Sequence, residues 1–238
     1  MRGFLRKTVN GFLGRFGYEF RRKHTSEGVL SSINFRTIID GGANVGKYSE
    51  EMRAKYPAAE IFAFEPTPRL FRGLRRRFAN EGRIVCYAEA LGERKETAVF
   101  HVTVDSVSSS LLEQTEPVAE AATEAVEVQV VTLNDWAAGR VIARPARLKL
   151  DIEGNELAAL RGAVKLLSQI DFVELETTFR NVRRGQPTLR ELLNFMHEHQ
   201  FDLVDIYPGI LDATTGRADW ADVLFAKRAD SIQTESAK

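Results

Sequence analysis

Ile38-Ile39-Asp40-Gly41-Gly42-Ala43-Asn44-Val45-Gly46 is the stretch that decides the fold. An apolar run typical of a buried strand ends in a glycine-rich turn, and a helical stretch follows over 47–56. Glycine lets a ligand approach the backbone closely, and the amides that open the helix point into the turn. The stretch predicts a nucleotide-like ligand, although tight strand-to-helix connections also need glycine for purely steric reasons.

A carboxylate ends the next apolar run, Phe62-Ala63-Phe64-Glu65-Pro66. It lies about 20–25 residues beyond the first strand, where nucleotide-binding folds place the acid that accepts from ribose hydroxyls. The dinucleotide fingerprint G-x-G-x-x-G requires glycine where Ala43 stands. A cofactor without a pyrophosphate is therefore favoured over NAD.

A third strand end, Leu148-Lys149-Leu150-Asp151-Ile152-Glu153-Gly154, also runs into a glycine. In the usual doubly wound order this strand neighbours the first, which puts Asp151 and Asp40 in one crevice at the carboxyl ends of the strands. An acid there suits a cationic sulfonium, whereas a helix cap over 151–154 is the structural alternative.

Short apolar runs alternate with helical stretches from residue 36 onward, which is typical of an α/β fold with a mainly parallel sheet. We expect a doubly wound, Rossmann-like domain with strands over 36–40, 60–64, 84–88, 147–151, 171–176, 202–206 and 222–227. Between the third and fourth strands, alternation over 97–103 and 126–133 predicts an inserted β-hairpin. Its long connection, 105–125, is interpreted as a lid or acceptor-binding element.

Composition limits the location and the partners. The chain has 238 residues and zero formal charge, so it lacks the overall basicity that favours nucleic acid. No apolar run approaches the roughly 20 residues of a membrane-spanning helix. Cys86 is the only cysteine, which excludes an intrachain disulfide and favours a cytoplasmic location.

Basic residues gather at the N-terminus. Residues 1–23 hold seven Lys or Arg against Glu19 alone, with apolar side chains spaced close to one helix face. We interpret 1–30 as a basic amphipathic helix docked on the domain or on a second subunit; peripheral contact with the inner face of an anionic membrane is the alternative. The main domain is expected over 31–230, with a disordered tail over 231–238. The sequence does not determine the oligomeric state.

Five blocks resemble, in matching order, the motifs of the FkbM family of methyltransferases. They are Asp40 to Gly46, Phe64-Glu65-Pro66, Ala90-Leu91-Gly92, Thr132-Leu133-Asn134-Asp135 and Lys149 to Gly154. The resemblance implies a class I, Rossmann-like domain whose seven-stranded sheet ends in an antiparallel strand, with S-adenosylmethionine as the cofactor. Asn44 agrees with the family, whereas Gly41 stands where relatives often carry an apolar residue.

The resemblance also implies roles at the cofactor site. Asp40, Gly42 and Gly46 would shape the loop at the methionine end, Glu65 would hold the ribose hydroxyls, and Glu89 or its neighbours would lie near the adenine. The expected cofactor-binding set is Asp40, Gly41, Gly42, Ala43, Asn44, Gly46, Glu65, Pro66, Glu89, Ala90 and Asp151.

By the same resemblance, the reaction is O-methylation of a small-molecule or glycan acceptor, such as a sugar, a glycolipid or a natural product. An alcohol must lose its proton, and we expect Asp151 to orient or deprotonate it, with His101 as the second candidate base. A divalent metal bridging the acceptor to Asp151, Glu174 or Glu176 is an alternative. No ligand spacing demands it, so no metal site is predicted.

Two other classes of protein stay open. A methyltransferase acting on RNA or protein is supported only by the arginine-rich helix predicted over 67–79, and the neutral charge argues against a nucleic-acid partner. A non-catalytic cofactor-binding protein is disfavoured because Asp40, Glu65 and Asp151 are all present. A polar loop that includes Arg183 either clamps anionic groups of an acceptor or is simply solvated.

Overall fold

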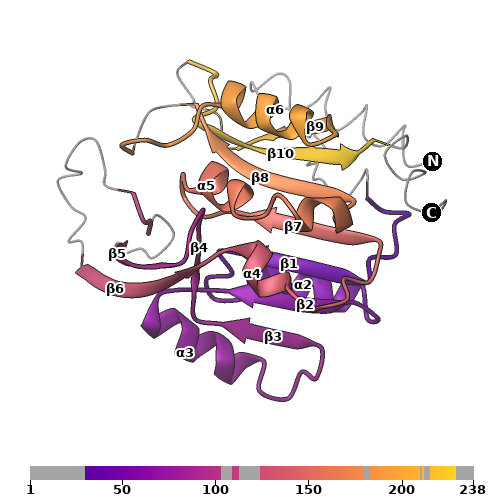
Figure 1. Ribbon diagram of the computed structural model, residues 1–238, viewed down its shortest axis with the longest axis vertical. Helices are drawn as coiled ribbons and strands as arrows, with labels where there is room; N and C mark the ends of the chain where they lie inside the picture. The colour runs from indigo at the N-terminus through magenta and orange to yellow at the C-terminus, as the bar shows by residue number, and fades with distance from the viewer. Residues whose placement is uncertain are drawn as a thin grey trace, which may run out of the picture. The chain divides into compact units, whose positions relative to one another are not determined.

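A computed structural model describes residues 30–102, 109–112, 124–179, 183–209, 211 and 215–228 (Figure 1). The predicted N-terminal helix over 1–30 and the tail over 231–238 lie almost wholly outside these residues. So does most of the connection over 105–125. Within the described part, no helix combines the length and the apolar composition needed to cross a membrane.

A seven-stranded sheet forms the centre of the domain that follows Ser31, in the order β3-β2-β1-β7-β8-β10-β9. Neighbours from β3 to β8 pair in parallel, and β10 pairs antiparallel with both β8 and β9. This confirms the predicted doubly wound fold and its antiparallel last strand. The strands are β1 (Thr37–Gly41), β2 (Glu60–Phe64), β3 (Ile84–Tyr87), β7 (Ala146–Leu150), β8 (Phe172–Thr178), β9 (Phe201–Pro208) and β10 (Trp220–Lys227).

Helices lie along the connections between the strands, as is usual for crossovers between parallel strands. They are α2 (Lys47–Lys55), α3 (Pro68–Arg77), α4 (Leu133–Ala137), α5 (Glu156–Arg161), the 3₁₀ helix η3 (Leu166–Gln169) and α6 (Leu189–Glu198). Local sequence sets their ends: Pro68 occupies the first turn of α3, and Thr188 with Glu191 forms a capping box at the start of α6. The crossovers bring the carboxyl ends of β1, β2 and β7 to one edge of the sheet.

The two faces of the sheet differ in polarity because successive residues of a strand point to opposite sides. On one face Ile39, Leu148, Leu150, Val173 and Leu175 pack with α4, α5, η3 and α6 in the main hydrophobic core. The alternating positions of β7 and β8 carry charge instead. Arg147, which is fully buried, pairs there with Glu174 and also contacts Met52 of α2.

The insertion between β3 and β7 forms a second, three-stranded sheet in the order β4-β6-β5. β5 (Glu96–Val102) and β6 (Glu124–Val131) pair antiparallel, which confirms the predicted hairpin. β4 (Ala90–Leu91), which the sequence pattern did not predict, pairs in parallel with β6. The side chain of Asn155, after β7, donates to the Leu91 carbonyl at 2.8 Å and so ties this sheet to the edge where β7 ends.

Candidate functional site

The glycine turn after β1 packs between the ends of β2 and β7. Gly42 N–H and Ala43 N–H both donate to the Phe64 carbonyl, and Asp151 N–H donates to the Gly41 carbonyl at 3.0 Å. Gly42 has φ +86°, and a Cβ there would lie 1.9 Å from the Asp151 carbonyl oxygen. Only glycine fits at this position, because the conformation is left-handed and a backbone atom fills the space of a side chain.

A pocket opens at this edge of the sheet, with an empty volume of about 520 Å³ that includes its solvent-open part. The turns after β1, β2, β3 and β7 line it, together with residues of β4, β5 and the insertion. The lining residues are Gly42, Asn44, Phe64, Glu65, Pro66, Thr67, Glu89, Ala90, Leu91, Phe100, Ser109, Leu111, Asp151, Ile152, Glu153 and Asn155.

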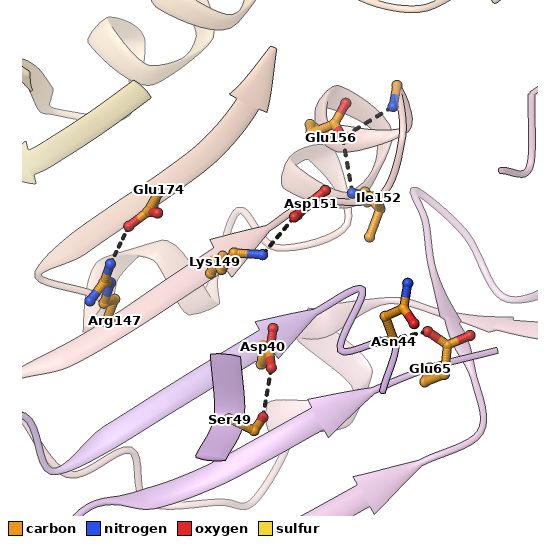
Figure 2. Close-up of polar contacts among 11 residues, drawn as sticks. Asp40, Asn44, Ser49, Glu65, Arg147, Lys149, Asp151, Ile152, Glu156 and Glu174 are labelled. Carbon is orange, nitrogen blue, oxygen red and sulfur yellow. Dashed lines mark hydrogen bonds and ion pairs between the residues drawn. The ribbon is translucent and has the colours of Figure 1, made fainter. Parts of the chain in front are cut away.

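Glu65 lies in this pocket with its carboxylate held by the backbone (Figure 2). Asn44 N–H donates to Oε2 at 2.9 Å, and Thr67 N–H donates to Oε1 at 2.8 Å. Each oxygen keeps a second lone pair, so the carboxylate can still accept from a ligand. Burial raises the pKa of Glu65, and the bonds from Thr67 and Asn44 oppose that shift.

Asp40 does not line the pocket, although its place at a strand end predicted a position in the cofactor site. The residue is fully buried, and Ser49 Oγ of α2 donates to Asp40 Oδ2 at 2.6 Å. Burial raises its pKa, and Lys149 acts against that shift. Gly41, Ala43 and Gly46 also lie outside the lining; a Cβ on Gly46 would meet Phe78 at 2.6 Å, so that glycine serves the packing of α2 against α3.

Asp151 lines the pocket, and its side chain is 37% exposed. Lys149, two residues earlier on the same face of β7, donates to Asp151 Oδ2 at 2.9 Å (Figure 2). Burial by itself would raise the pKa of Asp151, but the Lys149 charge and hydrogen bonds from Lys149 and Glu176 bring it below its ordinary value. The site therefore holds Asp151 as a carboxylate.

Glu156 supports the turn after Asp151, and no motif in the sequence pointed to it. Glu156 Oε1 accepts from the Ile152 and Gly154 amides, each at 3.1 Å (Figure 2). Burial raises the pKa of Glu156 to about 7, despite these two bonds. A carboxyl group shortly after a strand end is the only sequence signal that could have suggested this role.

His101, the second candidate base, lies on β5 and is not among the lining residues. Its backbone pairs with Ser110, while the neighbouring Ser109 and Leu111 reach the pocket. Ser110 Oγ donates to the Glu153 carbonyl at 2.8 Å, which fastens this part of the insertion to the turn after β7. Arg183, considered as a clamp for anionic acceptors, is instead buried and paired with Glu153 at 2.7 Å.

Comparisons with known proteins agree with this architecture. Residues 40–203 match the family model of the methyltransferase FkbM domain. A similar protein from Beauveria bassiana (strain ARSEF 2860), Methyltransferase 1, is 31% identical over 143 residues, and the match spans 52% of this chain and 57% of that protein. The 2-O-methyltransferase NoeI of Sinorhizobium fredii (strain NBRC 101917 / NGR234) is 23% identical over 182 residues, 72% of this chain and 74% of its own length.

Among solved structures, an rRNA methylase from Streptococcus thermophilus superposes with a TM-score of 0.50 and 11% sequence identity. The match covers 88% of this chain and 99% of that one, and at this identity it reports on the fold alone. The family model covers well over half of the chain, including the glycine turn, Glu65 and Asp151. The chain therefore belongs to the FkbM family of S-adenosylmethionine-dependent methyltransferases.

Proposed function

We propose that this protein transfers the methyl group of S-adenosylmethionine to a hydroxyl group of a sugar, glycolipid or natural-product acceptor. The observation that carries the proposal is one pocket lined by the Gly42 turn, by Glu65 and by Asp151. Similarity to a protein named as a 2-O-methyltransferase supports a hydroxyl as the methylated group.

The lining residues fit this cofactor. Glu65 offers two partly satisfied carboxylate oxygens to a pair of ribose hydroxyls, and Gly42 and Asp151 line the same pocket. The charged lining residues that the structure describes are all acids: Glu65, Glu89, Asp151 and Glu153. Acidic walls suit a cationic sulfonium and disfavour the phosphates of a dinucleotide.

Bound S-adenosylmethionine supplies a methyl carbon activated by its positively charged sulfur. In the transfer that the bound cofactor would support, the acceptor oxygen would form a C–O bond as the C–S bond broke, and the bonding electrons would leave with sulfur. Asp151 accepts a hydrogen bond from the acceptor hydroxyl and thereby orients the oxygen toward the methyl carbon. Alignment of the reacting atoms accelerates a displacement of this kind. The hydroxyl proton passes to Asp151 and then to water.

The lowered pKa of Asp151 favours orientation over early deprotonation, because a carboxylate of low pKa is a weak base toward an alcohol. Once the C–O bond has largely formed, the acceptor oxygen carries positive charge and is a much stronger acid than the alcohol was. Asp151 can then take the proton despite its weak basicity.

A labelled-methyl assay over a panel of sugars, glycolipids and phenolic or polyketide alcohols tests the function. Calorimetric titration should detect S-adenosylmethionine binding and no comparable binding of NAD. Asp151→Asn should lower turnover by roughly 100-fold or more, an effect typical of a group acting at the reacting atoms, and should weaken cofactor affinity much less. Asp135→Asn, which changes an exposed carboxyl on α4 outside the pocket, is the control. Full turnover by Asp151→Asn would refute this role, and preferential NAD binding would refute the cofactor.

A further inference from the structure

Three carboxyl groups meet beside the pocket. Oxygen atoms of Asp151, Glu153 and Glu176 lie within 4.8 Å of one another. They come from the end of β7, the turn after it and β8. Two of them line the pocket, so their charges act directly on whatever binds there.

Two cations form ion pairs with carboxylates of this cluster. Lys149 pairs with Asp151 at 2.9 Å, and Arg183 pairs with Glu153 at 2.7 Å; both cations are largely buried. Across the described ranges, no Lys, Arg or His forms an ion pair with Glu176. The nearby cation of β7, Arg147, is already paired with Glu174.

Further acidic groups lie near Glu176. Asp222 of β10 stands directly opposite it in the sheet, Glu174 precedes it on the same face of β8, and Glu156 of α5 adds further negative potential. Like charges at such short range cannot all be ionised in a half-buried site. A proton bound to one of the carboxyl groups would relieve this repulsion.

We infer that Glu176 is a protonated positioning residue, whose carboxyl O–H donates a hydrogen bond to the Asp151 carboxylate and fixes its orientation toward the acceptor. The inference rests on the proposed function, in which Asp151 receives the acceptor hydroxyl. Burial and the carboxylates of Asp151 and Glu153 raise the pKa of Glu176 to about 10, which agrees with this charge arrangement.

This arrangement has a chemical consequence for Asp151. Lys149 and Glu176 both hydrogen-bond its carboxylate, which stabilises the anion and limits rotation of the carboxyl plane. An oriented carboxylate presents a free lone pair to the acceptor in one direction only. Glu176 thus acts through Asp151 and does not itself need to contact the acceptor.

Infrared spectroscopy of the full chain tests the protonation without any acceptor. At pH 8.5, where Glu156 with its pKa of about 7 is ionised, the carbonyl-stretch band of a protonated carboxylic acid should still be present, should shift in D₂O and should disappear in Glu176→Gln. Glu127→Gln, which removes an exposed carboxyl on β6, is the matched control and should leave the band unchanged. A spectrum of Glu176→Gln identical to that of the wild type would overturn the inference.

The titration of Asp151, followed by NMR with ¹³C-labelled aspartate and assigned with Asp151→Asn, tests the positioning. Glu176→Leu, which cannot donate, should raise the midpoint by about one pH unit, the size expected for losing one hydrogen bond to a charged group. Glu176→Gln keeps an N–H donor and should leave the midpoint and kcat near wild type, while Glu176→Leu lowers kcat. An equal midpoint in both variants would overturn the positioning.

The same variants distinguish a resident proton from a bound metal ion. Binding of Mg²⁺ that is abolished by Glu176→Gln would mean that a cation, and not a proton, neutralises the cluster, and would overturn the inference. The spectroscopic results do not depend on methyl transfer. A protonated Glu176 in a protein that methylates no hydroxyl would support the charge state and refute the proposed function separately.

Discussion

Replacing Gly42 with alanine tests the close approach of the two turns on which the pocket depends. The substitution has two effects, since φ at Gly42 is +86° and the new Cβ would lie 1.9 Å from the Asp151 carbonyl oxygen. The left-handed conformation costs a non-glycine residue about 1–2 kcal/mol. Overpacking against a fixed backbone adds about 1–3 kcal/mol.

Two other glycines separate these effects. Gly139 has φ +74°, and a Cβ added there would meet no atom within 4 Å, so Gly139→Ala carries the conformational strain without the clash. Gly73, inside α3, has open space and a helical backbone. Gly73→Ala should stabilise the protein by roughly 0.5–1 kcal/mol through its higher helix propensity.

Thermal unfolding and calorimetric titration give the readouts. For a domain of this size, 1 kcal/mol corresponds to about 2–4 °C in Tm. Gly139→Ala should lower Tm by a few degrees, Gly73→Ala should raise it slightly, and Gly42→Ala should lower it by roughly 5–15 °C. Displacing the Gly42 turn should also weaken S-adenosylmethionine binding by roughly tenfold or more, since only about 1.4 kcal/mol of lost contact is needed. If Gly42→Ala matched Gly139→Ala in Tm and kept its cofactor affinity, the described packing of the β1 and β7 turns would be wrong.

Three further predictions concern buried charge. Glu65→Gln, which replaces one of the two oxygens held by backbone amides, should raise the dissociation constant for S-adenosylmethionine by roughly tenfold or more in calorimetric titration. The pKa of Glu156 is raised to about 7 in the folded chain, whereas the unfolded chain releases this proton at lower pH. The free energy of unfolding should therefore fall by up to about 3 kcal/mol as the pH rises from about 4.5 to about 7. Chemical denaturation of Glu156→Gln should show a flatter pH dependence. Arg147→Met leaves the buried Glu174 without its partner and should cost about 3–5 kcal/mol, whereas adding Glu174→Leu should recover much of that loss in denaturant titrations.

The positions of the strands along the chain could be predicted from the sequence because each strand carries its own local signal. Apolar runs bounded by helical stretches predicted all seven strands of the main sheet and the inserted hairpin. β4 was missed because two residues, Ala90 and Leu91, are too short for any periodicity. Its pairing depends on β6, which lies far along the chain, as the register Ala90↔Val130 records.

Some residues of the candidate site could likewise be predicted from the sequence, and others could not. Residues at strand ends, such as Glu65 and Asp151, could be placed in the pocket because parallel strands end at a common edge. Asp40 is also near a strand end, but it lies one residue before the end of β1 and contacts Ser49, a partner set by the packing of α2. The sequence suggested Glu176 only as a possible metal ligand, because its protonation depends on the pairing of Lys149 with Asp151 and of Arg183 with Glu153, which the fold sets.

The alternation of Arg147 and Lys149 with Leu148 and Leu150 has a consequence for folding. Shifting a strand by one residue exchanges the faces of all its side chains. Such a slip of β7 would place Arg147 and Lys149 in the hydrophobic core beneath α5 and α6, and Glu174 would lose its ion pair with Arg147. The alternating charges therefore disfavour folding intermediates in which β7 is shifted by one residue between β1 and β8.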